Sequence, residues 1–507
     1  MLKTKAISKI PKHLHKYVVE QDYDRYTSED QEVWRFVMRQ LKSFLGTNAH
    51  GAYLKGLSLT GITTDQIPEI TKMDEKLIPF GWRAMPVSGF IPPAAFMEFQ
   101  AFGILPIACD MRTVDHILYT PAPDIVHEAA GHAPILIDPE FSQYLKNYAE
   151  VASKAIISHE DLNLYEAIRN LSDIKEAPQS SKEDILKSEQ ELKIAIQNTT
   201  YISEAQFLGR MNWWTAEYGL IGSLKNPKIF GAGLLSSIGE SRLAVQKPKL
   251  IPLTIDCLNY SYDITEPQPQ LFVSEDFKSL NLVLNELGQT MAFKVGGLEG
   301  LRKAKEAKTV CTVVLVNDLI NESKSTNESN IQTESQSSYS GILIDYNSIG
   351  LTFKGPIQIK ENNEIRLLHD DVFKLKINNK TVTSVYGGPI DSSQFPDSVD
   401  FVATRVPTKN RSDYDLKKFE LYSQIRLLRS NFSTQDFLKI KSEYIQNYKS
   451  EWLMGLGLLE LCAPHVNLEP QLLELVNHYS QYQVKSENEK LCVDLGLALL
   501  KSEGLLL

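Results

Sequence analysis

Apolar residues recur at helical intervals in the first part of the chain. Ser28 stands three residues before Gln31, a spacing typical of a capping box at the start of a helix. Further along, Asp138 and Pro139 predict a second helix start, with aspartate as the cap and proline in the first turn. The positions that predict one buried face on the first helix are Val33, Trp34, Val37 and Leu41.

The pattern changes beyond residue 297. A β-branched run at residues 310–316 predicts a buried strand, and the run rich in Ser, Asn, Glu and Gln at residues 317–340 predicts a polar loop. Residues 341–404 alternate short β-branched runs with Asn, Gly and Pro, which predicts a small β domain. Helical spacing of apolar residues then returns at Leu416, Phe419, Tyr422, Ile425 and Leu428.

These patterns predict an α+β chain with several domains, because 507 residues exceed what one hydrophobic core usually supports. The lysine-rich start is interpreted as a solvated tail, since no apolar signal core follows it. The parts we expect are an N-terminal tail at residues 1–22, a mainly helical domain at 23–297, a β-rich domain at 298–405 and a helical C-terminal region at 406–507.

The composition limits the classes of protein to which the chain can belong. The chain has 43% hydrophobic and 23% charged residues, which is typical of a soluble globular protein, and its net charge of -10 argues against a nucleic-acid-binding surface. The apolar run at residues 452–461 is interrupted by Glu460 and is too short to span a bilayer. Five cysteines without paired metal spacing are interpreted as reduced thiols of a cytoplasmic protein. Neither nucleic acid nor a membrane is expected as a partner.

The strongest chemical pattern is YTPAPDIVHEAAGHAP at residues 119–134. It places His127 and His132 five residues apart in a short apolar stretch. On an ideal α-helix, side chains five apart point roughly 140° away from each other. Both imidazoles can therefore bind one metal ion only if the helix is widened or ends near Gly131. Pro134 is consistent with such an ending.

Glu217 is the candidate for a third metal ligand. It lies among Trp213, Trp214 and Tyr218, where a buried carboxylate without a cation would be costly. Two histidines and one carboxylate on one side of an ion are typical of non-haem Fe(II) oxygenases. Taken singly, each residue is more often a hydrogen-bonded core residue. A zinc hydrolase with Glu128 as general base is an alternative that the five-residue spacing disfavours.

Four segments in this order resemble the pterin-dependent aromatic amino acid hydroxylases: GWRAMPVSGF, YTPAPDIVHEAAGHAP, WWTAEYGL and GAGLLSSIGE. The resemblance covers roughly residues 23–272. It implies a hydroxylase catalytic domain in which His127, His132 and Glu217 hold Fe(2+), with a tetrahydropterin cofactor and O2. The implied substrate is a free aromatic amino acid. L-phenylalanine, converted to L-tyrosine, is expected because it is the usual substrate of bacterial forms with a single catalytic domain.

The resemblance also implies where the organic molecules bind. Phe96 would stack on the pterin ring, Gly89 and Ile91 would line the same pocket, and Glu128 would lie beside the pterin. Arg112 would pair with the substrate carboxylate through two parallel hydrogen bonds. The other substrate contacts that it implies are Thr120, Pro121, Trp213, Gly233, Ser236 and Ile264, with Gly233 to Ser236 in a turn. Asp124 could accept a hydrogen bond that orients a ligand imidazole.

The chain departs from the family pattern at several pocket positions. Pro106 and Asn212 replace a histidine and a tyrosine, Ala122 replaces an acidic residue, and Tyr218 stands where phenylalanine is common. The apolar Ile264 favours phenylalanine or tryptophan over tyrosine as substrate. The alternatives are therefore a tryptophan or tyrosine hydroxylase of the same family, and a non-catalytic iron-binding relative that acts as a regulatory or interaction protein.

Two regions fall outside the resemblance. Residues 158–200 are charged and helical in pattern, and we interpret them as an insertion, either a lid, a contact surface or a solvated excursion. The half of the chain beyond residue 297 contains no catalytic constellation. A role in oligomerisation or protein contact is a hypothesis for it.

Overall fold

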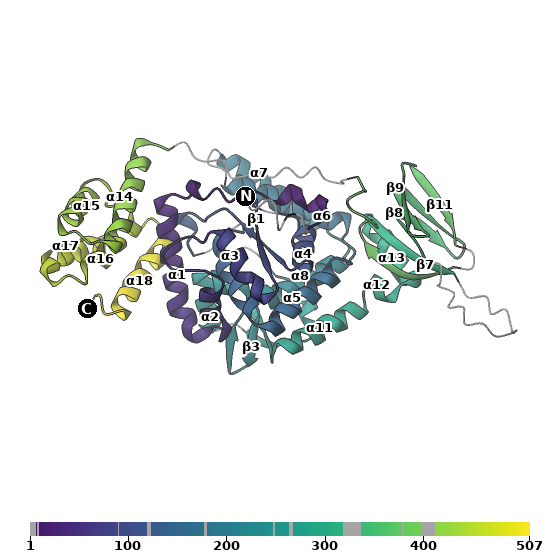
Figure 1. Ribbon diagram of the computed structural model, residues 1–507, viewed down its shortest axis with the longest axis horizontal. Helices are drawn as coiled ribbons and strands as arrows, with labels where there is room; N and C mark the ends of the chain where they lie inside the picture. Colours follow the sequence, from purple (N-terminus) through teal and green to yellow (C-terminus); the bar gives the residue numbers. More distant parts are fainter. Residues whose placement is uncertain are drawn as a thin grey trace.

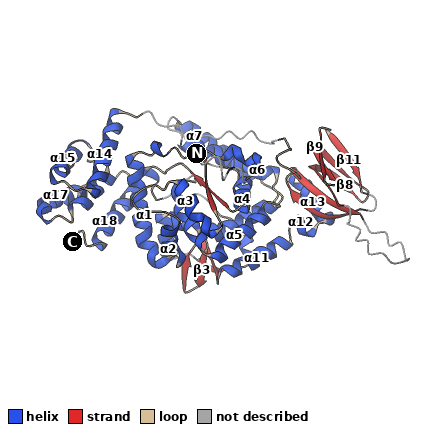
Figure 2. Cartoon of the chain, viewed as in Figure 1, coloured by secondary structure: helices blue, strands red, loops and turns tan. Residues whose placement is uncertain are grey.

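The chain forms a central helical domain with a β-sheet at one end and a helical bundle at the other (Figure 1). Strands dominate only the sheet end (Figure 2), so the expected α+β fold class is confirmed. The computed structural model describes residues 7, 10–89, 91–118, 123–176, 180–246, 249–262, 267–317, 336–377, 380–396 and 411–506.

The central domain contains a parallel pair of strands, β1 and β2, and a four-stranded sheet in the order β4, β3, β6, β5. Helices surround both. The helices and strands in chain order are α1 (Ser28–Asn48), α2 (Ala52–Leu59), α3 (Ile70–Leu77), β1 (Arg83–Val87), α4 (Pro93–Ala101), β2 (Ile104–Ala108), the π-helix η7 (Val126–His132), the 3-10 helix η8 (Ala133–Ile137), α5 (Pro139–Ala152), α6 (His159–Glu176), α7 (Lys182–Asn198), α8 (Glu204–Asn212), the π-helix η9 (Trp213–Glu217), β3 (Leu220–Ser223), β4 (Asn226–Ile229), α9 (Ala232–Ser236), α10 (Ile238–Gln246), β5 (Lys249–Pro252), β6 (Gln270–Ser274) and α11 (Phe277–Gln289).

The helix predicted near Ser28 is α1, but its cap lies one residue earlier. The Thr27 side chain accepts a hydrogen bond from the Asp30 backbone N–H, and the Asp30 carboxylate accepts one from the Thr27 N–H. The four apolar residues that predicted its buried face are all buried. Asp138 caps α5 as predicted, accepting from the backbone N–H groups of the two residues after Pro139.

The N-terminal segment is not the solvated tail that the lysines indicated. Ile10, Leu14 and Tyr17 are buried in a small core that also contains residues of β1 and α4. The Val19 N–H donates to the Pro86 carbonyl at 3.1 Å. The prediction was wrong for these residues because apolar side chains at spacings of four and three residues are buried, whereas Lys12 between them is exposed. Ile91 belongs to the same core, so this segment supports the loop that ends β1.

The β-rich region is a six-stranded antiparallel sheet that follows helices α12 (Ala292–Val295) and α13 (Gly297–Ala307). β8 begins at Gln336, within the range expected to be a polar loop; the loop residues 318–335 lie outside the described residues. A strand forms there because residues 336–342 pair antiparallel with residues 310–316 of β7, and the Ser340 hydroxyl lies 2.8 Å from that of Thr312. The strands are β7 (Val310–Asn317), β8 (Gln336–Asn347), β9 (Gly350–Glu361), β10 (Glu364–Leu368), β11 (Val372–Lys376) and β12 (Lys380–Gly387).

The C-terminal region is a helical bundle, as predicted. Its apolar run forms α16, which is buried at every position except Glu460. Among the described residues, no helix is long and apolar enough to cross a membrane. On α14, Leu416 is exposed while Tyr422, Ile425 and Leu428 face the core. The helices are α14 (Asp413–Ser430), α15 (Thr434–Asn447), α16 (Trp452–Cys462), α17 (Glu469–Ser480) and α18 (Glu487–Ser502).

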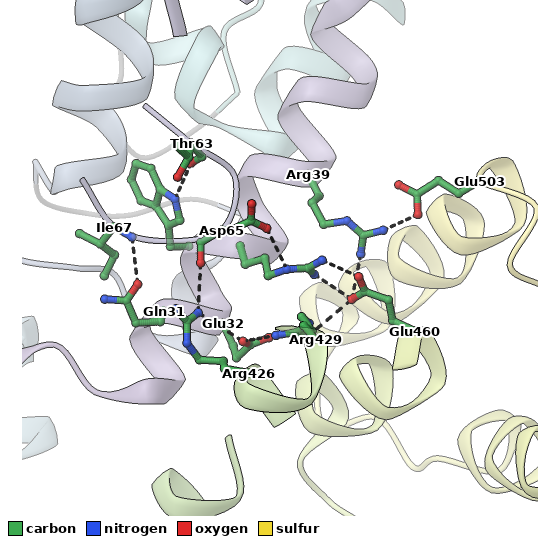
Figure 3. Close-up of polar contacts among 12 residues, drawn as sticks. Gln31, Glu32, Arg39, Thr63, Asp65, Ile67, Arg426, Arg429, Glu460 and Glu503 are labelled. Carbon is green, nitrogen blue, oxygen red and sulfur yellow. Dashed lines mark hydrogen bonds and ion pairs between the residues drawn. The ribbon is translucent and has the colours of Figure 1, made fainter. Parts of the chain in front are cut away.

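The bundle docks on α1 through a network of ion pairs (Figure 3). The Glu460 carboxylate accepts a hydrogen bond from Arg35 at 2.7 Å, and it lies 3.2 Å from Arg39 and 3.6 Å from Arg429. Arg429 also pairs with the buried Glu32 of α1. The C-terminal helices are therefore held against the central domain of the same chain.

Candidate metal centre

His127 and His132 lie on the π-helix η7. Hydrogen bonds in a π-helix join residues five apart, so side chains at this spacing lie about one turn apart on the same face. The two imidazole centroids are 4.9 Å apart, with an interplanar angle of 89°. The helix is therefore widened at the predicted place, and the 3-10 helix η8 follows it directly.

Gly131 allows a second helix to approach these imidazoles. A Cβ atom at this position would lie 2.6 Å from the carbonyl oxygen of Ala232, so only glycine permits α9 to pack so closely on η7. α9 lies within the sequence GAGLLSSIGE, where a turn was expected. The observed short helix brings Ser236 next to His127.

Glu217 reaches the imidazoles from the end of the second π-helix, η9. Its Oε2 atom lies 3.4 Å from His127 Nε2, and its Oε1 atom lies 3.3 Å from His132 Nε2. A second acid is close: Glu128 Oε2 lies 3.9 Å from His132 Nε2, and the ligand atoms of His127, Glu128 and His132 lie within 4.8 Å of one another. Geometry alone therefore offers two candidate carboxylates.

The charge states of the two acids favour Glu217 as the ligand. Burial raises the pKa of the Glu128 carboxyl to about 8, so this group is largely protonated at pH 7. Burial would also raise the pKa of Glu217, but His132 and His127, with a hydrogen bond from Asn212, lower it to about 2. The ionised carboxylate at the centre is therefore Glu217, and a cation binds an ionised oxygen in preference to a protonated one.

The two imidazoles also differ in pKa and therefore in charge. Burial lowers the pKa of His127 to about 4, so this ring is neutral. Burial would also lower that of His132, but the nearby Glu217 carboxylate raises it to about 8. A metal ion bound at His132 Nε2 would displace the proton held there.

Ser236 fixes the tautomer of His127. The Ser236 hydroxyl donates to the Ala232 carbonyl at 2.7 Å, so its oxygen accepts the proton of His127 Nδ1 at 3.0 Å. The lone pair of His127 Nε2 then faces Glu217. Asp124 does not have this orienting role, since it accepts the backbone N–H of His127 at 3.0 Å rather than a ring N–H.

The donor set fits a divalent metal ion. Among the described residues, no hydrogen bond reaches either ring nitrogen of the buried His132, and its Nε2 lies 3.3 Å from Glu217 Oε1 as an ion pair. A buried ring nitrogen without a hydrogen bond is costly unless it binds a ligand. Two imidazoles and one carboxylate also leave coordination positions open, as in non-haem Fe(II) sites.

Arg112 is buried, and its hydrogen bonds reach Asp124 and Ser236, which both contact His127. Its Nε and Nη2 atoms donate to Asp124 at 2.7 and 2.8 Å. Its Nη1 atom donates to the carbonyl oxygens of Ser236 at 3.2 Å and Ile117 at 3.5 Å. Four of its five N–H groups are therefore engaged. The expected two-bond pairing with a substrate carboxylate would require the long contact to Ile117 to be exchanged.

Of the residues expected to contact pterin, Phe96 and Glu128 lie beside His132. The Phe96 ring on α4 is 6.3 Å from the His132 ring, centroid to centroid. Ile91 is buried, and Gly89 has a positive φ of 33° that favours glycine. Their contacts with a pterin remain a prediction.

The residues expected to contact the substrate are only partly described. Both faces of the Trp213 indole are covered, one by Tyr218 and the other by Tyr262. Gly233 packs against the Tyr218 ring, and a Cβ atom there would lie 2.9 Å from it. Thr120, Pro121 and Ile264 lie outside the described residues, as does Ala122.

Sequence reasoning missed several contacts that shape the site. The hydrogen bond of the Ser236 hydroxyl to His127 was not foreseen, and the expected contact of Ser236 with the substrate stays a prediction. The stacking of Tyr262 on Trp213 and the hydrogen bond from Tyr218 to Glu240 were not foreseen. These partners are far apart in the chain, and the only available signal was that Ser236 and Glu240 fall in the segment GAGLLSSIGE.

Comparisons with known proteins agree with the geometry. The family model of biopterin-dependent aromatic amino acid hydroxylases matches residues 4–165 and 177–296, and its break falls within the expected insertion. The phenylalanine-4-hydroxylase of Chromobacterium violaceum is 26% identical over 268 residues, which are 52% of this chain and 75% of that protein. That of Mesorhizobium japonicum is 28% identical over 269 residues, which are 52% of this chain and 81% of that protein.

One solved structure that resembles the chain is the Chromobacterium violaceum enzyme with bound iron(III) and 7,8-dihydrobiopterin. It is 25% identical and covers 54% of this chain and 85% of its own, with a TM-score of 0.41. The family model covers more than half of the chain, including the N-terminal segment and all three candidate metal ligands. The chain therefore belongs to the family of biopterin-dependent aromatic amino acid hydroxylases.

Proposed function

We propose that this protein is an iron- and tetrahydropterin-dependent monooxygenase that converts L-phenylalanine to L-tyrosine with O2. The observation that carries the proposal is the convergence of His127, His132 and the ionised Glu217 around one point. Membership of the biopterin-dependent family supports the cofactor. The phenylalanine-4-hydroxylases among its relatives support the substrate.

His127, His132 and Glu217 would hold Fe(II) from one side and leave positions open for O2 and water. When bound, the iron and the reduced pterin supply the electrons that activate O2 for ring hydroxylation. Ser236 keeps the His127 lone pair directed at the metal. Glu128, which is protonated near pH 7, can donate a hydrogen bond to a pterin beside His132.

Arg112 would bind the amino acid carboxylate. Asp124 holds one side of the guanidinium through Nε and Nη2, which leaves the edge formed by Nη1 and Nη2 directed elsewhere. The ion pair with Asp124 keeps this buried cation in place when no substrate is bound. Exchange of the weak Ile117 contact for a carboxylate would give the two-bond pairing.

Reconstitution with iron tests the proposal. The protein is loaded with Fe(II) under anaerobic conditions. It is then given tetrahydropterin, O2 and each of phenylalanine, tryptophan and tyrosine, and the products are identified by mass and ring position. Tyrosine from phenylalanine is expected. A hydroxylated product from another substrate alone would reassign the substrate. No product from any of the three would favour a non-catalytic iron-binding relative. Bound zinc with peptidase activity would reject the hydroxylase.

Arg112→Ala tests the substrate contact separately. We expect a higher KM for the amino acid, because loss of a buried charge-assisted pair costs about 2 to 5 kcal/mol, with iron content unchanged. An unchanged KM would contradict the role of Arg112. His132→Ala should abolish iron retention and turnover together, which separates loss of the metal from loss of the substrate.

A further inference from the structure

Three aromatic rings form a continuous stack beside the metal centre. Tyr262 lies on one face of Trp213, with ring centroids 4.4 Å apart and an interplanar angle of 11°. Tyr218 lies on the other face, at 4.5 Å and 23°. Tyr218 directly follows Glu217 in the chain, so the stack begins one residue from the candidate metal carboxylate.

Two hydrogen bonds hold the stack, one at Tyr218 and one at Trp213. The Tyr218 hydroxyl donates to Glu240 Oε2 on α10 at 2.6 Å. The Trp213 indole N–H donates to Gln268 Oε1 at 3.2 Å. Gly233 on α9 contacts the Tyr218 ring so closely that no side chain fits between them. Tyr218 is therefore held by stacking on one face, by close packing against α9 and by a hydrogen bond at its tip.

Glu240 has few ways to replace this hydrogen bond. It is half-buried on α10, where its backbone N–H donates to the Ser237 hydroxyl at 3.2 Å. A carboxyl in such surroundings needs a donor, and the Tyr218 hydroxyl supplies it. A phenylalanine at position 218 could not make this bond.

Because Tyr218 and Tyr262 cover both faces of the Trp213 indole, a substrate ring cannot stack on either face. With Tyr218 and Tyr262 in place, only an edge of the indole is available to another ring. Edge-to-face contacts between aromatic rings depend on the orientation of both rings, because the positive edge of one meets the negative face of the other. The orientation of the stack therefore matters more than it would for a broad face contact.

We propose that Tyr218 and Glu240 are positioning residues for the aromatic substrate, because their hydrogen bond fixes the orientation of the Trp213 edge beside the metal centre. The inference rests on the proposed function, since it assumes that an aromatic amino acid binds next to Glu217. It goes beyond that function because it assigns the orientation of Trp213 to a hydrogen bond with α10 and not to the metal ligands.

The test measures binding of phenylalanine to the Fe(II)-loaded protein under anaerobic conditions by calorimetry. Iron content, KM and kcat are measured in parallel. Tyr218→Phe should weaken binding and raise KM by roughly 5-fold, the equivalent of one lost hydrogen bond of about 1 kcal/mol. Iron content and kcat should stay within about twofold. Glu240→Gln should retain most of the affinity, because its amide oxygen can still accept from Tyr218.

Tyr339→Phe is the matched control. Tyr339 is a buried tyrosine whose hydroxyl also donates to a glutamate, Glu361, but it lies in the β-rich region. It should leave phenylalanine binding unchanged. Wild-type affinity in Tyr218→Phe would overturn the inference, as would loss of iron in proportion to the loss of affinity. A wild-type protein that binds no aromatic amino acid would overturn the proposed function, and the inference with it.

Discussion

Ser236 shows how one hydroxyl can control a metal ligand. It donates to a carbonyl and accepts from His127 Nδ1, which leaves only Nε2 for a metal. Ser236→Ala would remove this acceptor and allow the ring to rotate or change tautomer. We expect iron affinity to fall by roughly 10- to 100-fold, as is typical when a partner of a ligand histidine is removed. Competition with a chelator of known affinity measures this.

Ser241→Ala is the control for that measurement. Ser241 is also a buried serine, and its hydroxyl donates to the Ile238 carbonyl on α10 rather than to a metal ligand. Iron affinity should be unchanged in this variant. Equal losses in Ser236→Ala and Ser241→Ala would show that the effect is a general one on packing.

Glu240 makes the stability of the fold depend on pH. Burial raises the pKa of its carboxyl from 4.5 to about 7, against the opposing hydrogen bond from Tyr218. The unfolded chain ionises near the lower value, so the contribution of Glu240 is fully present below pH 4.5 and is lost as pH rises toward 7. Relative to Glu240→Gln, the wild type should lose at most about 1.4 kcal/mol per pH unit in this range.

Thermal melts of the two proteins at a series of pH values measure this difference. The melting temperature of the wild type should fall relative to that of Glu240→Gln between pH 5 and 7 and then level off. A difference that is independent of pH, or a wild type that gains stability as pH rises, would contradict the raised pKa.

At the scale of elements, α16 joins the C-terminal bundle to α1 through Glu460. This carboxylate faces Arg35, Arg39 and Arg429, and its side chain is only 15% exposed. Glu460→Gln would leave three arginines around a neutral amide. We expect a loss of about 3 kcal/mol in the free energy of unfolding, within the range for breaking a buried ion pair by removal of one partner. Chemical denaturation measures it.

The control for Glu460 lies on the same bundle. Glu474 pairs with Lys441, but its side chain is 56% exposed, so Glu474→Gln should cost less than about 1 kcal/mol. Faster hydrogen exchange at the α1–α16 contact in Glu460→Gln alone would identify the docking contact as the part that weakens. Similar costs for both variants would show that the network contributes no more than a surface pair.

At the scale of the molecule, Glu204 links the β-rich region to the helix that leads to the metal centre. It is 4% exposed at the start of α8 and accepts hydrogen bonds from the backbone of Ile156 at 3.0 Å and Ala292 at 2.6 Å. It also accepts one from Lys303 of α13 at 3.0 Å. α8 continues directly into η9 and Glu217, so the junction and the site share one continuous helical segment.

Glu204→Gln should loosen this junction, because an amide offers one acceptor oxygen in place of two and no charge to Lys303. Loss of about 2 kcal/mol, typical of leaving buried donors unpaired, would speed hydrogen exchange in α12 and α13 by roughly 30-fold. Glu299→Gln, which removes an exposed pair with Arg302, should change exchange little. Unchanged exchange in α12 and α13 would contradict the role of Glu204.

The fold bears on the two regions outside the resemblance, the C-terminal bundle and the helices α6 and α7. The C-terminal bundle is already held against α1 of its own chain by Glu32 and Glu460, so this face is occupied within one molecule. Oligomerisation through other faces stays a prediction. The helices α6 and α7 pack against each other, and their interpretation as an insertion also stays a prediction.

The sequence by itself determined the local elements and the chemistry. Helical spacing and caps predicted α1 and α5, and the five-residue spacing of His127 and His132 required a helix that is widened or ends near Gly131, because these features depend on residues close together in the chain. Tertiary structure alone decided the rest. Nothing near Ser236 indicates that its hydroxyl meets His127, or that Glu240 meets Tyr218, since such contacts depend on how closely α9 and α10 pack on the metal helices. Gly131 permits that packing, but its partner Ala232 is far away in the chain.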